Sequence, residues 1–169
     1  MTPKQTFINT EIWLLTFGGA FQRANVYAKN TSEVQRREFR KALSTFVEVN
    51  LAVQYQQTVS EDTHIMNIHT LISFSAKHGE LLNGEKITFG VAQKILNLYL
   101  KYQWCLGNIP TPPHFPVDRI IQGKLELPKI INWTTLNSET EYRNIIEKAK
   151  EMAKSKFNSL AEWELINFD

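Results

Sequence analysis

The stretch GVAQKILNLYLKY, residues 90–102, constrains the fold most strongly, because it reads as a helix that is apolar on most of its sides. Apolar residues at positions 91, 95, 98 and 102 share one helical face, and those at 96, 99 and 100 extend the apolar surface. A helix of this kind is expected at the centre of its domain. Its polar residues must then meet water, a cleft or buried partners.

Other segments carry signals for further helices. Three pairs of residues have the capping-box spacing that marks a helix start. They are Ser32 with Gln35, Ser138 with Glu141 and Ser159 with Glu162. Ser60 precedes another amphipathic segment, with apolar residues at 65, 68, 71 and 72. The proline-rich run 108–116 is expected to be extended, and residues 117–125 to form a short helix.

The N-terminal segment 10–21 is expected to be helical and to be broken at the pair Gly18-Gly19. An alternating strand pattern or a hairpin signal between apolar runs is not evident. We therefore expect an all-α fold, a single domain over residues 1–169 with about six or seven helices.

Composition agrees with an ordinary globular domain. The chain has 169 residues, of which 43% are hydrophobic and 21% are charged, so disorder is not expected. Cys105 is the single cysteine, which excludes an internal disulfide and fits a reducing compartment. The first residues do not read as a signal peptide, and no apolar run is long enough to span a bilayer. We expect a cytoplasmic, intracellular protein that does not act in a membrane, with a monomer as the default state.

Lys94, Asn97 and Lys101 form a polar stripe on the 90–102 helix, because their i, i+3, i+7 spacing places them on one face. In one interpretation the stripe is solvated and the lysine stems cover the core. In the other, a lysine lies in a cleft, where partial desolvation lowers the pKa of its amine enough for nucleophilic attack.

Asp118 follows Pro116-Val117 at the start of the short helix expected over 117–125. It can be a first-turn acid, which is favourable at the positive end of the helix dipole. Alternatively, the rigid proline turn brings its carboxylate back to the N-terminal part of the preceding helix, where Lys94 lies.

The segments FGVAQKIL and FPVDRII together resemble motifs of the helix-hairpin-helix DNA glycosylases. The first is similar to the hairpin pattern Gly-Val-Gly-x-Lys, with Ala92 in place of the second glycine, and the second to the Pro-Val-Asp segment. The 8-oxoguanine branch, in its archaeal type, is more similar, because it shares a Pro-rich approach to Pro-Val-Asp. A C-terminal acid with an aromatic residue four positions later, here Glu164 and Phe168, adds to the resemblance. It covers about residues 84–125, which would hold a helix-hairpin-helix-like element, and more weakly the C-terminal helix.

The resemblance implies a DNA glycosylase/lyase that excises an oxidised purine such as 8-oxoguanine from damaged duplex DNA. Lys94 would be the nucleophile that forms a Schiff base, with Lys86 as a rival in the alignment, and Asp118 would assist it. The flipped base needs apolar walls and polar readers. The candidates for this base pocket are Gln93, Phe89, Trp163, Glu164 and Phe168, with Trp104 as a further wall. The candidate DNA contacts are Gly90, Lys101 and Arg119.

The sequence predicts neither a metal site nor a cofactor. The histidines at 64, 69, 78 and 114 lack metal-ligand spacing with Cys105 or with a carboxylate pair. The net charge of only +2 gives no strong overall field, so a DNA-binding protein would have to place its positive charge locally. A cluster of basic residues at positions 36–41 can serve DNA binding or can be a solvated helix face.

Two other functions compete with the glycosylase. The chain can be a catalytically inert protein of the 8-oxoguanine glycosylase fold that binds nucleic acid or a modified nucleotide. It can also be a small helical protein-interaction module whose motifs resemble that family by accident. A cleft shared by Lys94 and Asp118 would favour the first two functions over the third.

Overall fold

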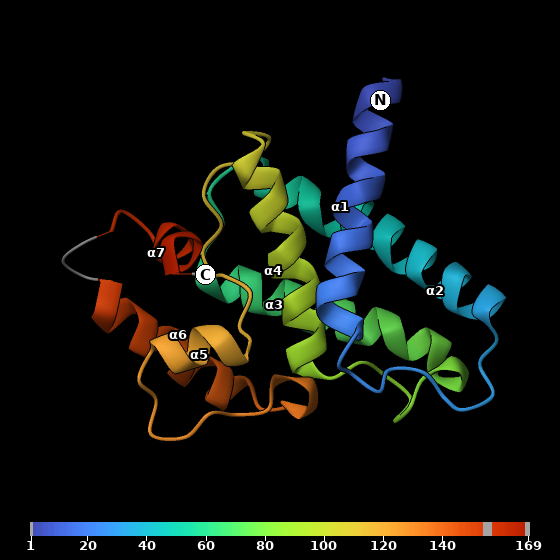
Figure 1. Cartoon of the computed structure of the whole chain (residues 1–169). Helices are drawn as coiled ribbons and strands as arrows, with labels where there is room; N and C mark the ends of the chain where they lie inside the picture. Colours follow the sequence, from blue (N-terminus) through green and yellow to red (C-terminus); the bar gives the residue numbers. More distant parts are fainter. Residues whose placement is uncertain (1, 154–156, 168–169) are drawn as a thin grey trace.

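The computed structural model describes residues 2–153 and 157–167 and is built from helices (Figure 1). The described part contains seven α-helices and no β-strand; Tyr27 and Leu82 form an isolated antiparallel bridge. The α-helices are α1 (Pro3–Phe21), α2 (Glu33–Phe46), α3 (Glu61–Ser75), α4 (Phe89–Cys105), α5 (Arg119–Lys124), α6 (Glu139–Ala153) and α7 (Leu160–Asn167). Shorter helical segments are η1 (Val47–Leu51), η2 (Ala52–Gln56), η3 (Ala76–Leu81) and η4 (Trp133–Thr135). The all-α prediction is confirmed.

Helix α4 is the central element of the fold. Every residue from Phe89 to Leu100 is buried, as its nearly continuous apolar sequence predicts. Helices α1 and α3 and the short segment η4 pack against it. In Figure 1, α1 and α2 lie on one side of α4, and α5, α6 and α7 lie on the other. The polar residues of α4 are therefore enclosed, and each of them needs a partner.

The predicted helix starts at Ser32 and Ser60 are confirmed by their hydrogen bonds. The Ser32 hydroxyl accepts a hydrogen bond from the Gln35 N–H, and the Gln35 side chain closes the capping box. Ser60 caps α3 in the same way through the N–H of Thr63. Ser138 and Ser159 each accept a hydrogen bond from the backbone N–H three residues later, at the starts of α6 and α7.

Helix α1 corrects one expectation, because it runs without a break through Gly18 and Gly19. A Cβ atom at Gly19 would lie 2.8 Å from the Leu98 side chain, so the missing side chain lets α1 approach α4 closely. The sequence at residues 2–5 also contains a helix-start signal that the expected segment 10–21 did not include. Thr2 forms a capping box with Gln5, and Pro3 occupies the first helical position.

The Pro-rich run between α4 and α5 is non-helical, as predicted, and α5 begins directly after Asp118. The chain thus leaves the far end of α4 and returns along the domain before α5 starts. Among the residues described, none of the helices combines the length and the hydropathy that crossing a bilayer requires.

Candidate active site

Lys94 and Asp118 form a largely buried ion pair. The Lys94 Nζ atom lies 2.9 Å from Oδ2 of Asp118, and the two side chains are only 9% and 17% exposed. Lys94 is fixed by the central helix α4, and Asp118 is fixed by the start of α5. The structure therefore brings together the two residues that the sequence singled out from separate segments.

The carboxylate of Asp118 has a second task, as the N-cap of α5. Its Oδ1 atom accepts a hydrogen bond of 3.0 Å from the backbone N–H of Ile121. One oxygen thus begins the helix while the other faces the Lys94 amine. The two interpretations of Asp118 that the sequence left open both apply, because each uses a different oxygen.

Gln93 holds the chain immediately before Asp118. Its Oε1 atom accepts from the Val117 N–H at 3.1 Å, and its Nε2 donates to the Val117 carbonyl at 2.8 Å. Because a side-chain amide pairs with a backbone peptide in this way, the position of Asp118 relative to α4 is doubly tied. Gln93 was expected to read a purine edge. It is instead fully buried, and its side-chain amide is hydrogen-bonded to the backbone of Val117.

Trp133, in η4, completes the surroundings of the amine. The Lys94 Nζ atom lies 4.5 Å from the centroid of the Trp133 ring, within the range of a cation–π contact. Sequence reasoning missed this residue, because η4 is a single short turn that has no periodic apolar pattern. The only local signal is Asn132, whose side chain accepts a hydrogen bond from the N–H of Thr134 and caps that turn.

Burial lowers the pKa of the Lys94 amine below its ordinary value, and the nearby Arg23 adds a smaller effect in the same direction. The Asp118 carboxylate opposes this shift by stabilising the ammonium form. Desolvation has a larger effect on the pKa than Asp118 has, so Lys94 loses its proton at a lower pH than an exposed lysine does. This is the property that a nucleophilic lysine requires.

A second buried ion pair lies two turns further along α4. Lys101 Nζ lies 2.8 Å from Oε2 of Glu164 and 3.0 Å from Oε1, and Glu164 belongs to α7. Burial raises the pKa of Glu164, whereas Lys101 lowers it by a smaller amount. Lys101 was expected to contact DNA and Glu164 to read a base; the structure pairs them with each other.

The remaining polar residue of the stripe belongs to a buried network. Asn97 donates to Gln93 Oε1 and to the Tyr142 hydroxyl, both at 3.1 Å. The same hydroxyl lies 3.1 Å from Nδ1 of the buried His114. Lys94, Asn97 and Lys101 thus each contact a partner within the protein, so the interpretation of the stripe as a solvated face is wrong.

The aromatic residues expected to form base-pocket walls pack into the core. The Phe89 ring lies 5.2 Å from that of Tyr142, and the Trp163 ring lies 5.6 Å from that of Phe115. Both residues are buried. Trp104 is half-buried and packs against the core, and Phe168 lies outside the described residues. Contact with the amine is instead made by Trp133.

Gly90 is a packing glycine in the first turn of α4. A Cβ atom there would come within 1.7 Å of the Trp133 carbonyl oxygen, and the Gly90 N–H donates to the Leu136 carbonyl at 2.8 Å. Its amide is therefore not directed at a phosphate, as its expected role in DNA binding required. Its absent side chain lets η4, and with it Trp133, reach the Lys94 end of α4.

Lys86, the rival nucleophile, is exposed and precedes the N-cap Thr88 of α4. It forms no ion pair with a carboxylate in the described part of the chain, whereas Lys94 pairs with Asp118. Geometry thus favours Lys94 over Lys86 as the lysine of a reactive pair.

A cleft of about 370 Å³ is lined by Trp133, which contacts the Lys94 amine, but neither Lys94 nor Asp118 lines it. Arg23 and Arg119 line it together with residues 130–134. Arg119 was expected to contact DNA, and its exposed position in the cleft is compatible with that role. Arg23 was missed, because it lies in a loop with no motif around it. The chain matches no family model, no curated protein and no solved structure.

Proposed function

We propose that Lys94 and Asp118 are the nucleophile and the assisting acid of a DNA glycosylase/lyase that removes an oxidised purine such as 8-oxoguanine. The chain would then be a member of the helix-hairpin-helix glycosylases, of the 8-oxoguanine branch, with the element implied for residues 84–125 formed around the start of α4. The observation that supports this proposal most is the 2.9 Å contact between a buried, pKa-lowered amine and a carboxylate at a helix start.

The reaction needs an unprotonated amine. Asp118 or water accepts a proton from the Lys94 ammonium, and the amine attacks the sugar C1′ atom. A C–N bond forms as the bond from C1′ to the purine breaks, and the base leaves with the bonding electron pair and takes up a proton. The attached nitrogen then loses a proton, and the C1′–O4′ bond breaks as O4′ gains a proton. The nitrogen lone pair forms the C1′=Nζ double bond of a protonated Schiff base.

Asp118 has a second role while the base departs. Positive charge develops at C1′ and O4′ before the new bond is complete, and a fixed carboxylate stabilises it. The N-cap bond to Ile121 and the Gln93–Val117 pairing hold this carboxylate without any rearrangement. Such pre-organisation is what electrostatic stabilisation of a transition state requires.

Borohydride trapping tests the proposal. The wild-type protein is incubated with a duplex that carries one 8-oxoguanine, and reduction of the Schiff base converts it to a stable covalent adduct. We expect an adduct with the damaged duplex and none with the matched undamaged duplex. A protein that forms no adduct, either with 8-oxoguanine or with a duplex that has an abasic site, is not a Schiff-base glycosylase/lyase.

The packing of the expected base pocket favours a second candidate function. Gln93 and Glu164 are engaged by Val117 and Lys101, and so are not free to read a purine. A catalytically inert protein of the same fold, which binds nucleic acid or a modified nucleotide, needs no such reader beside the amine. Binding to the damaged duplex without trapping would identify this function.

A further inference from the structure

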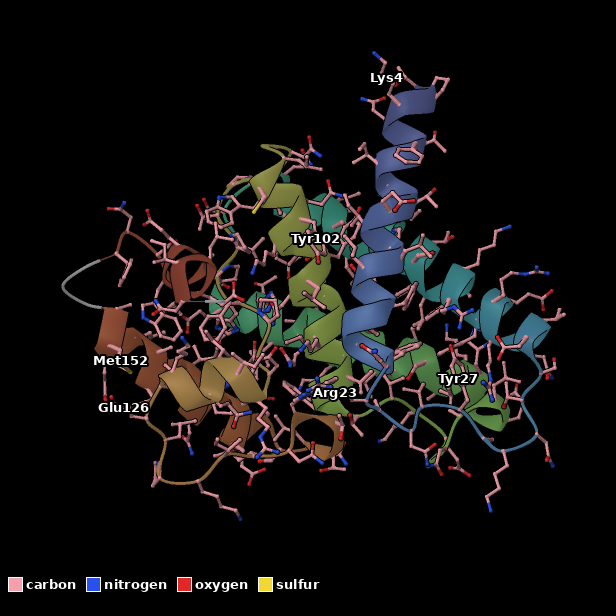
Figure 2. All side chains as sticks on the ribbon, in the orientation of Figure 1. Lys4, Arg23, Tyr27, Tyr102, Glu126 and Met152 are labelled. Carbon is pink, nitrogen blue, oxygen red and sulfur yellow. The ribbon has the colours of Figure 1, made fainter. Side chains whose placement is uncertain are left out.

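We infer that the cleft between the end of α1 and residues 130–134 binds a backbone phosphodiester of the DNA strand whose sugar faces Lys94. The inference rests on the proposed function, because it takes the Lys94 site to be a DNA site. It assigns a binding role to Arg23 and Arg119, which reach the cleft from different parts of the chain. Figure 2 labels Arg23 close to the lower end of α1, beside the junction with the C-terminal half of the fold.

Two cations share this cleft, and no carboxylate lines it. Arg23 and Arg119 are both exposed, and neither forms an ion pair with another residue that the structure describes. The cleft residues between 130 and 134 include no carboxylate. Two guanidinium groups that line the same cleft repel each other, and an anion bound between them would offset this repulsion.

Several other basic side chains have an acid within reach, which neutralises their charge. These pairs are Arg36 with Glu33, Arg143 with Glu139 and Asp62, Lys148 with Glu151, and Lys150 with Glu61 and Glu147. The cleft therefore offers local positive charge in a protein whose net charge is only +2.

The chemistry of the ligand follows from the side chains. A guanidinium presents a planar fork of N–H donors, which matches two oxygens of a phosphate. The cleft is narrow, with a volume of about 370 Å³, so it accommodates a phosphate group and part of its sugar rather than a whole duplex. Phosphate contacts of this kind fix the register of a strand without reading its sequence.

Trp133 connects the cleft to the amine. It lines the cleft, and the Lys94 Nζ atom lies 4.5 Å from the centroid of its ring. Arg23 is also close enough to Lys94 to lower the pKa of its amine. A phosphodiester in the cleft would thus lie next to the nucleotide whose C1′ atom meets Lys94. Its negative charge would also oppose the repulsion between Arg23 and the Lys94 ammonium.

The test measures DNA binding under conditions in which the Schiff-base reaction cannot occur. Fluorescence anisotropy follows the titration of wild-type protein, Arg23→Gln and Arg119→Gln into a labelled duplex with a tetrahydrofuran abasic site, which cannot form a Schiff base. The titrations are repeated over a range of salt concentrations. Lys29→Gln is the control, because it also removes one exposed positive charge, and Lys29 lies outside both the cleft and the basic cluster at 36–41.

Each cleft variant should weaken binding about tenfold. It should also reduce the slope of log affinity against log salt by about one, since one phosphate contact is lost. Lys29→Gln should leave both quantities at the wild-type values. Unchanged circular dichroism and melting temperature would show that both cleft variants are folded, as expected for exposed side chains.

The outcomes separate the inference from the proposed function. If wild-type protein binds the duplex and both cleft variants bind equally well, the phosphodiester site is wrong, whatever the trapping assay shows. If the cleft variants lose affinity but no duplex is trapped, the site stands and the glycosylase proposal fails. If the wild-type protein does not bind the duplex at all, the inference is overturned.

Discussion

The Lys94 amine lies 2.9 Å from one oxygen of Asp118, while the other oxygen of the same carboxylate starts helix α5. A residue of the central helix and the first turn of a later helix are thus linked through a single side chain. Because the two oxygens have different tasks, substitutions can remove one task and retain the other.

Lys94→Gln should abolish the borohydride adduct, because an amide is not a nucleophile under these conditions. The amide can still donate a hydrogen bond to Asp118, so the loss of unfolding free energy should stay near 1–3 kcal/mol, roughly the cost of weakening one buried charged contact. Trapping and urea denaturation measure the two effects separately. Lys86→Gln is the control and should keep both the adduct and the stability of the wild type. If Lys86→Gln loses the adduct and Lys94→Gln keeps it, Lys86 is the nucleophile.

Asp118→Asn and Asp118→Ala should differ in stability and agree in activity. Asparagine is a good N-cap, so it retains the bond to Ile121, whereas alanine should cost about 1 kcal/mol more in unfolding free energy. Both remove the charge beside Lys94, and we expect trapping to slow by about 10²–10⁴-fold in each. Single-turnover trapping and thermal melts provide the data. A wild-type rate for Asp118→Asn would show that the carboxylate charge has no part in the reaction.

Trapping should depend on pH through the amine of Lys94. Burial places the pKa of this amine below the ordinary value of 10.5, so the rate should rise with pH and level off before that value. Between the lowered pKa and 10.5 the unfolded chain binds more protons than the folded chain, so this group's contribution to the unfolding free energy increases as pH rises. Urea midpoints of wild type and Lys94→Gln, measured from neutral to alkaline pH, should therefore diverge in that direction. A rate that keeps rising up to 10.5 would mean that the reactive lysine is an ordinary exposed one.

Gly90→Ala should destabilise the protein strongly. The added Cβ atom would come within 1.7 Å of the Trp133 carbonyl oxygen, so the backbone of η4 has to move away from α4. We expect a loss of about 3 kcal/mol or more in unfolding free energy, at the upper end of overpacking costs. Gly18→Ala is the matched control, because its Cβ atom meets nothing within 4 Å. In the last turn of α1 it should be neutral or stabilising by up to about 1 kcal/mol. Equal stabilities of the two variants would contradict this account of η4.

Tyr142→Phe should cost about 1–3 kcal/mol of unfolding free energy, because it leaves Asn97 and His114 without their buried hydroxyl partner. Tyr102→Phe is the control, because Tyr102 is half-buried and its hydroxyl forms no hydrogen bond with a residue that the structure describes. It should change stability by less than about 0.5 kcal/mol. Chemical denaturation of both variants measures this difference. A Tyr142→Phe protein as stable as the wild type would show that water replaces the hydroxyl.

The sequence by itself determined the helices and their starts. Local signals sufficed there, since a capping serine contacts a backbone group only three residues away, as at Ser32 and Ser60. The central position of α4 also followed from sequence, because a helix that is apolar on most sides must be covered on most sides. The same reasoning was wrong at the Gly18-Gly19 pair, which was expected to break the helix, since whether glycine breaks a helix depends on what packs against it.

Only the tertiary structure decided what the polar residues of α4 do. The sequence placed Lys94, Gln93 and Lys101 on one helix, but their partners Asp118, Val117 and Glu164 lie in other elements. Spacing along a helix fixes which face a side chain occupies and not which distant segment covers that face. The contact of Trp133 with the amine depends on the missing side chain of Gly90. These residues are far apart in the sequence, so no local pattern predicts that they pack together.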